Sequence, residues 1–388
     1  MLRSAAMTLR FVSLLAVFSV CASFAACSSD DSSNGGSGGT AGSAGAGGTA
    51  AVGGGAGVDA GVDASDDGDA AFTPDGYIPD PLPEHISFAA KNPIPTGLSL
   101  LFDDWNANPN KVLSIRPDGT GETEIFQAYR VWSLGASHDG NTVAFACGDP
   151  LQLEHYGLAL GDAIQNTWLY DTSAQTAKVL SFGNINDECH TFNQKDDTLY
   201  VCRRYDFQEL PGPQFSNKGY QLGRMNVASG AFEFLTPEPV MKLEVSPEPT
   251  ADESEIYYTV VEIQGGTQSR SIVKTTLPTG TPTKVVDSAT LRDLSPDGTK
   301  LLYQNHLDKG TLYVSDVDGA NAVQVTSHPG TNASFSPDGS RIAYLYGETQ
   351  SCNHIETVAV DGSEAGAPKR VRDCGTAFVT DLVWIDKQ

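Results

Sequence analysis

The sequence Phe335-Ser-Pro-Asp-Gly-Ser-Arg-Ile-Ala-Tyr344 repeats an earlier one, Leu294-Ser-Pro-Asp-Gly-Thr-Lys-Leu-Leu-Tyr303. In each copy an apolar residue ends one strand, Ser-Pro-Asp-Gly makes a tight turn, and an alternating run begins the next strand. Looser copies run over 136–145 and 192–201, and a degenerate one lies near 245–258. The repeated unit is therefore a β-hairpin.

A second hairpin follows each copy of the first. Thr311-Leu-Tyr-Val-Ser-Asp-Val-Asp-Gly319 runs into Ala322-Val-Gln-Val-Thr326, and a similar pair covers 112–126. Four strands that recur every 40–50 residues or so are typical of propeller blades. Counting these units predicts an all-β, six-bladed β-propeller. Seven blades is the alternative, if the irregular region 203–260 contains two.

The first and last units are each incomplete. Residues 96–127 have the later strands of a blade but no Ser-Pro-Asp-Gly phrase before them. The chain ends with Phe378-Val-Thr-Asp-Leu-Val-Trp384-Ile-Asp, in which Trp384 aligns with Phe335. We expect this C-terminal strand to pair with the N-terminal blade and close the ring, which removes open sheet edges.

The Ser-Pro-Asp-Gly phrase and the Asp-x-Asp-Gly of the second hairpin resemble the WD40-like repeats of TolB-type propellers. The resemblance covers about 96–388 and implies a fold more than an activity. In that family, the member in the Tol system binds a peptidoglycan-associated lipoprotein. The family's separate N-terminal α/β domain has no counterpart in this sequence, and a low-complexity segment stands in its place.

Residues 1–26 have the three parts of a secretory signal peptide. Arg3 and Arg10 form the positively charged N-terminal region, and residues 11–20 form an apolar run that is too short for a membrane span. Small residues follow and lead to Phe24-Ala25-Ala26-Cys27, where cleavage is expected. A cut before Cys27 resembles the lipobox of bacterial lipoproteins, which predicts lipidation at Cys27. The family prefers Leu where this chain has Phe24, so an ordinary signal peptide is the alternative. Ser28 follows the cysteine, whereas Asp at this position in the lipoprotein family suggests retention at the inner membrane. The sequence therefore predicts a protein anchored to the outer membrane and facing the periplasm or the cell surface.

The segment that follows is rich in Gly, Ala, Ser, Thr and Asp. It cannot bury enough apolar surface to offset its ordering entropy, so we expect residues 27–80 to be a disordered tether and 81–388 to be the propeller. Its Gly-rich part, residues 28–72, is about 45 residues long and has an r.m.s. reach of roughly 35–40 Å.

The charge balance is acidic, with 24 Lys and Arg against 48 Asp and Glu. Nucleic acid is therefore excluded as a partner, because binding phosphates needs a basic surface. We expect a monomer that contacts the membrane only through its lipid anchor.

Mapping the chain onto a propeller places its chemically versatile side chains on one face, in the loops that enter the innermost strands or leave the second strands. The Ser-Pro-Asp-Gly turns fall on the opposite face and are interpreted as structural. The binding-face candidates are His155, Asp187, Glu188, His190, Arg203 and His354. Asp187-Glu188-Cys189-His190 is the densest polar cluster, and it has two interpretations: a solvated loop, or groups for acid–base or cation chemistry at the channel mouth.

Five cysteines follow Cys27, which indicates an oxidising compartment and disulfides. The first expected pair is Cys352 with Cys374. Cys189 pairs either with Cys202, across one hairpin, or with Cys147. A Cys/His metal site lacks the usual ligand spacing, so no metal or other cofactor is predicted, and calcium has no complete ligand set.

The sequence therefore favours a non-catalytic binding or scaffolding module at the cell envelope, with a protein, peptidoglycan or glycan partner on the loop-rich face. The alternative is an enzyme, a hydrolase or lyase with a metal-assisted site at the channel mouth. Fold alone does not separate the two, because propellers host many unrelated functions.

Overall fold

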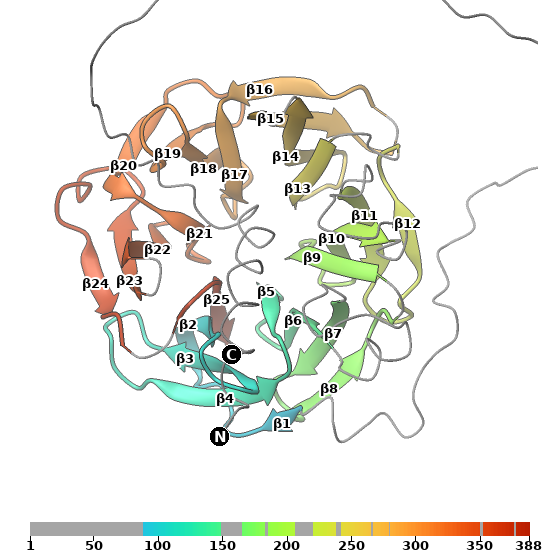
Figure 1. Ribbon diagram of the computed structural model, residues 1–388, viewed down its shortest axis with the longest axis vertical. Helices are drawn as coiled ribbons and strands as arrows, with labels where there is room; N and C mark the ends of the chain where they lie inside the picture. Colours follow the sequence, from blue (N-terminus) through green and yellow to red (C-terminus); the bar gives the residue numbers. More distant parts are fainter. Residues whose placement is uncertain are drawn as a thin grey trace, which may run out of the picture.

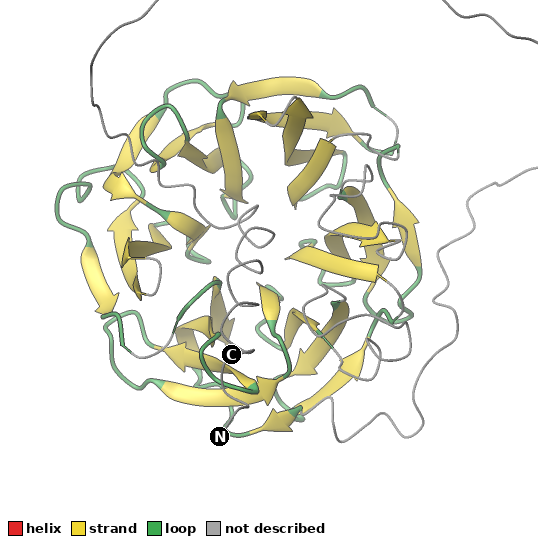
Figure 2. Ribbon diagram, in the orientation of Figure 1, coloured by secondary structure: helices red, strands yellow, loops and turns green. Residues whose placement is uncertain are grey.

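The computed structural model describes six β-sheets arranged around a central axis (Figure 1). The described residues are 88–148, 165–182, 185–205, 220–237, 242–264, 267–278, 280–349, 352–375 and 378–388. Within them the chain forms strands, turns and loops and no helix (Figure 2), so no described segment could cross a membrane as a helix. The predicted six-bladed β-propeller is confirmed.

Each blade is an antiparallel sheet whose strands run outward from the axis in chain order, except in the first blade. Blade one consists, from the axis outward, of β25 (Leu382–Lys387), β2 (Gly97–Asp104), β3 (Asn110–Ile115), β4 (Thr123–Ala128) and the short β1 (Ala89–Ala90). Blade two consists of β5 (Trp132–Ala136), β6 (Thr142–Cys147), β7 (Asn166–Asp171) and β8 (Thr176–Val179). Blade three consists of β9 (Ile185–Phe192), β10 (Thr198–Tyr205), β11 (Gln221–Asn226) and β12 (Phe232–Phe234).

The remaining blades repeat the same plan. Blade four consists of β13 (Lys242–Pro249), β14 (Glu255–Gln264), β15 (Thr267–Thr276) and β16 (Thr283–Asp287). Blade five consists of β17 (Ala289–Leu294), β18 (Lys300–Asn305), β19 (Thr311–Asp316) and β20 (Val323–Pro329). Blade six consists of β21 (Thr331–Phe335), β22 (Arg341–Thr349), β23 (Cys352–Ala359) and β24 (Lys369–Arg372).

The Ser-Pro-Asp-Gly phrases join the innermost strand of a blade to its second strand. In blade five the Ser295 hydroxyl donates to Asp297 (2.6 Å), whose carboxylate also accepts the N–H of Thr299 (3.1 Å). Gly298 adopts a positive φ of 69°, which glycine tolerates without strain. All these turns lie on one face of the ring, here called the turn face, and the opposite face is called the loop face.

The C-terminal strand closes the ring as predicted. β25 pairs with β2, with Trp384 opposite Leu100, so the last residues of the chain form the innermost strand of the first blade. Trp384 is buried between blades one and six, and its indole N–H donates to the carbonyl of Ser334 at 3.0 Å.

A buried carboxylate holds the segment that leads into this strand. Asp103, at the end of β2, accepts the backbone N–H groups of Thr380 (2.7 Å) and Asp381 (2.8 Å) and the hydroxyl of Thr380. Asp103 is fully buried, and burial raises its pKa to about 7. This side chain therefore joins two parts of the chain that are 277 residues apart.

Candidate functional site

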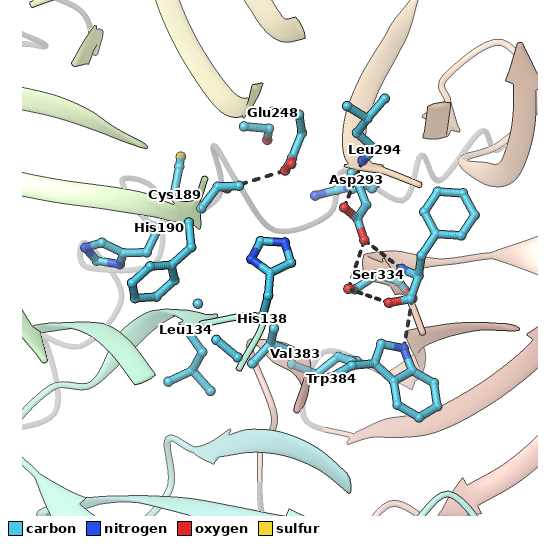
Figure 3. Close-up of a pocket in the computed structure, with 18 of the residues that line it drawn as sticks. Leu134, His138, Cys189, His190, Glu248, Asp293, Leu294, Ser334, Val383 and Trp384 are labelled. Atoms are coloured by element: carbon cyan, nitrogen blue, oxygen red, sulfur yellow. Dashed lines mark hydrogen bonds between the residues drawn. The ribbon is translucent and has the colours of Figure 1, made fainter. Parts of the chain in front are cut away.

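A central channel runs along the axis of the ring and holds a cavity of about 460 Å³ (Figure 3). The innermost strands of all six blades contribute to its wall: β5, β9, β13, β17, β21 and β25. The lining also includes residues of the turns that follow these strands, such as His138, Pro296 and Pro337. The cavity therefore extends to the turn face.

Asp293 of β17 ties blade five to blade six inside this channel. One carboxylate oxygen accepts the N–H of Phe335 (2.6 Å) and the hydroxyl of Ser334 (3.0 Å), while the other accepts the N–H of Leu294 (2.8 Å). Burial raises the pKa of Asp293 to about 6, although these hydrogen bonds act in the opposite direction.

Asp381 does the same between blades one and two. It accepts the N–H of Leu134 at 2.6 Å on one oxygen and that of Leu382 at 2.9 Å on the other. Burial raises the pKa of Asp381 to about 7. Two of the carboxylates that line the channel thus also join neighbouring blades.

Glu248, at the end of β13, is held much less firmly. Its side chain lines the cavity but only 9% of the residue is exposed, and its one hydrogen bond within the described chain comes from the Thr191 hydroxyl at 3.4 Å. Burial raises the pKa of Glu248 well above its usual value, and the negative charge of Asp293 raises it further.

His138 replaces the proline of the repeated turn and borders the same cavity as Glu248 and Asp293 (Figure 3). Its Nδ1 lies 2.9 Å from the Asp196 carboxylate, which also accepts the N–H of His138 (2.9 Å) and that of Asp139 (3.1 Å). Asp196 belongs to the corresponding turn of blade three, so these contacts join two turns and fix the imidazole.

The densest predicted polar cluster lies inside the protein. Arg203 of β10 forms a bidentate ion pair with Asp187 of β9, at 2.6 and 2.8 Å, and both side chains are at most 1% exposed. The Ser181 hydroxyl (2.6 Å) and the Thr167 hydroxyl (3.0 Å) donate to the same carboxylate. Burial opposes ionisation of Asp187, but Arg203 outweighs it and holds the pKa of the carboxyl below its usual value.

His190 belongs to this buried network and not to an exposed surface. Its Nδ1 lies 2.7 Å from the Ser133 carbonyl and its Nε2 lies 3.0 Å from the Thr167 hydroxyl, while burial lowers its pKa. Cys189 has a positive φ of 62°, which interrupts the alternation of the strand, so Asp187 and His190 both contact Thr167 while Glu188 does not. Glu188 lines the channel and accepts from Tyr220 (2.7 Å) and Asn186 (2.9 Å).

His354 lies in blade six, away from the Asp187 network. It is buried, and its Nδ1 accepts the N–H of Cys374 at 3.0 Å. Nearby, the buried carboxylate of Glu356 contacts His328 of blade five at 3.1 Å and accepts the Tyr344 hydroxyl at 2.6 Å. The predicted binding-face residues that the structure describes therefore lie in two separate clusters, one in blade three and one in blade six.

The His328–Glu356 contact makes stability depend on pH. Its hydrogen bond to Glu356 raises the pKa of His328, so this contribution is complete below about 6.5 and is lost as pH rises through the folded value. Burial opposes ionisation of Glu356, but His328 and Tyr344 lower its pKa to about 2, so the carboxylate contributes above about 4.5.

We therefore expect His328→Phe to lower the free energy of unfolding by about 1 kcal/mol near pH 5.5 and by much less near pH 8.5. Phenylalanine keeps a ring beside Tyr346, whose centroid lies 3.9 Å from that of His328. Urea denaturation of both proteins at the two pH values measures the difference. A Lys111→Met control, which breaks a half-exposed ion pair with Glu124, should show no such dependence. An equal cost of His328→Phe at both pH values would contradict the expectation.

The cysteines are distributed as follows. Cys189 and Cys202 form a disulfide across the β9–β10 hairpin, which is one of the two predicted alternatives. Cys147 is a buried thiol whose Sγ lies 3.1 Å from the Tyr129 carbonyl. Cys374 is disulfide-bonded. The side chain of Cys352, His155 as a whole and the predicted lipidation residue Cys27 lie outside the described part of the structure.

The sequence interpretation missed three carboxylates that line the channel, those of Glu248, Asp293 and Asp381. Asp293 and Asp381 each precede a leucine in or at the start of an innermost strand, and Glu248 sits in the degenerate repeat. The one departure in the sequence that could have indicated the channel was His138, which stands where the best copies of the repeat have proline. No three or more His, Cys, Asp or Glu side chains of the described residues are grouped to hold a metal ion.

No protein-family model and no curated protein sequence matches the chain. Solved structures do match its fold. TolB from Acinetobacter baumannii is 14% identical, with a TM-score of 0.55 over 76% of this chain and 68% of that one. TolB from Agrobacterium tumefaciens is 11% identical, with a TM-score of 0.50 over 75% of this chain and 98% of that one.

A third match is to hydrazine synthase from Kuenenia stuttgartiensis, at 10% identity and a TM-score of 0.56. The alignment covers 76% of this chain and about half (47%) of that one. At these identities the likeness concerns the fold, and it agrees with the TolB-type propeller that the repeats predicted.

Proposed function

We propose that this TolB-like propeller is a non-catalytic binding module of the bacterial envelope that takes a protein partner at the turn-face mouth of its central channel. The observation that carries the proposal is the channel itself: six inner strands surround a cavity of about 460 Å³ that has both polar and apolar lining residues and extends to the turn face. By contrast, Asp187 and Arg203 are buried and bonded to each other, and the buried His190 is bonded to Ser133 and Thr167, so these polar groups already have partners inside the protein.

This proposal moves the binding surface from the loop face, where the sequence placed it, to the channel. The loop-face candidates that the structure describes are largely buried. Glu188 remains a candidate, because it lines the channel near its loop-face end. Docking on the loop face is the competing outcome of the experiment.

Site-specific photo-crosslinking in native envelopes tests the proposal. The crosslinker is placed at Gln194 or Ala251, which line the turn-face end of the channel, and in a second set at Leu307, which is 81% exposed in the loop-face turn of blade five. We expect one protein to be captured from Gln194 and Ala251 and not from Leu307. Capture from Leu307 alone would place the partner on the loop face and contradict the proposal.

The envelope location rests on the predicted lipidation of Cys27, from which the tether would let the propeller reach partners at a distance from the bilayer. Cys27→Ala should move the protein from the membrane fraction to the soluble fraction of lysed cells. Retention of the variant in the membrane fraction would contradict lipid anchoring.

A further inference from the structure

We propose that Glu248, beside Asp293, binds a cationic group of the partner polypeptide: the side chain of a lysine or arginine that enters the channel. This inference rests on the proposed function and adds to it the chemistry by which the channel recognises its partner.

The first support is the unused bonding capacity of Glu248. A carboxylate can accept about four hydrogen bonds. Glu248 is nine-tenths buried and receives one long bond, 3.4 Å from Thr191, in the described structure. Buried polar groups are nearly always paired, so a carboxylate left in this state inside a cavity indicates a missing partner.

The second support is the position of Asp293. Its two oxygens already accept hydrogen bonds from Phe335, Ser334 and Leu294, so it is fixed in place and its negative charge acts on Glu248. Two buried carboxylates that face one another do not both ionise without a compensating charge. Either Glu248 keeps a proton, or a cation occupies the space beside it.

The other charged groups of the channel do not supply that cation. Arg292, next to Asp293 in β17, directs its guanidinium to Gln304 and Asn332. The positive charge of His138 lowers the pKa of Asp293, but the imidazole is hydrogen-bonded to Asp196 and not to Glu248. The ionisable residues that line the channel are His138 after β5, Glu188 and His190 of β9, Glu248 of β13, Arg292 and Asp293 of β17, Asp381 just before β25 and Asp386 of β25, while the described lining from β21 contributes none.

Isothermal titration of the full-length protein tests the inference, with the peptides Gly-Lys-Gly and Gly-Arg-Gly, acetylated at the N-terminus and amidated at the C-terminus, as probes. The same blocked Gly-Lys-Gly with an acetylated lysine side chain is the neutral control, and CaCl₂ tests a divalent ion. Titrations in two buffers with different ionisation enthalpies count the protons exchanged. We expect both cationic peptides to bind and to release protons near pH 6, because a cation ionises a protonated Glu248. The neutral control peptide should not bind measurably.

Glu248→Gln should weaken the cationic peptides about tenfold or more and abolish the proton release, since the neutral amide keeps the shape but not the charge. Glu244→Gln is the matched control on the same strand: Glu244 is also buried, but it is bonded to Thr236 and Leu222 outside the channel lining. Thermal melts of both variants verify folding.

Equal affinity of the wild type and Glu248→Gln, binding of the neutral control peptide, or no saturable binding of either cationic peptide at millimolar concentration would overturn the inference. So would calcium that competes with the peptides through Glu248. The crosslinking experiment distinguishes failure of this inference from failure of the proposed function. If the crosslinker at Ala251 captures the partner equally well in the wild type and in Glu248→Gln, the partner binds at the channel but its contact with Glu248 is not required.

Discussion

Asp103→Ala should lower the free energy of unfolding by about 3–4 kcal/mol, the first of the two largest effects that we expect. The carboxylate is fully buried and accepts three hydrogen bonds from Thr380 and Asp381. Alanine leaves two buried N–H groups and one hydroxyl without their acceptor, and it leaves a cavity where the last strand joins the first blade. Urea denaturation at pH 7 measures the loss.

Asp103→Asn is the informative companion. The amide oxygen can accept the same two N–H groups, so this variant should keep most of the stability that alanine loses. Burial raises the pKa of Asp103 to about 7, above its usual 3.8, so the wild type loses stability as pH rises between these values. Asparagine does not titrate, and its stability relative to the wild type should therefore increase from pH 5 to pH 8.

Asp118→Ala is a control in the same blade, because Asp118 lies in an exposed turn and accepts hydrogen bonds only from Thr120 within the described residues. We expect Asp118→Ala to lower the free energy of unfolding by much less than Asp103→Ala does. If Asp103→Ala were as stable as Asp118→Ala, closure of the ring would not depend on the buried carboxylate.

Breaking the Asp187–Arg203 pair is the second large effect. Asp187→Ala or Arg203→Met should each cost about 3–5 kcal/mol, because each leaves one charge buried without its partner. Arg203 also stacks on Phe232, with its guanidinium carbon 3.6 Å from the ring centroid. The flexible side chain of methionine partly replaces this packing in Arg203→Met. The double variant Asp187→Ala/Arg203→Met should cost less than the sum of the two single variants.

The three free energies of unfolding form a double-mutant cycle that isolates the pair. The exposed pair Lys284–Asp287 provides the matched comparison, with side chains 59% and 71% exposed, and its cycle should give about 0.5 kcal/mol or less. Additive costs for Asp187 and Arg203 would show that their bidentate contact does not stabilise the protein.

The fold was predictable because short segments of the repeat specify their own turns and strands. Ser-Pro-Asp-Gly specifies a turn wherever it occurs, and alternating runs such as Arg341-Ile-Ala-Tyr344 specify a half-buried strand on either side. Ring closure was predictable for a similar reason, since the first unit lacked an inner strand and the segment around Trp384 was an inner strand without a blade. β1 has only two residues, which is too short for any pattern to indicate.

The site was harder to predict, because strand alternation and interblade packing decide which polar groups are buried. Asp187, Glu188 and His190 are close in sequence, yet Glu188 bonds to Tyr220 and Asn186 while the other two bond to Arg203, Thr167 and Ser133. Cys189 has a positive φ of 62° at this point, so a simple alternation does not hold through the segment. Glu248 and Asp293 come together from different blades, and nothing in either local sequence relates them.

The position of β25 also has a consequence for the order of biosynthesis. The strand nearest the axis of the first blade follows every other described strand in the chain, so β2 keeps an open edge until β25 has been synthesised. An exposed strand edge is a template for pairing with other chains. A nascent chain that has not yet reached Leu382 therefore remains an open arc, and pairing of the six-residue β25 with β2 is the step that removes this open edge.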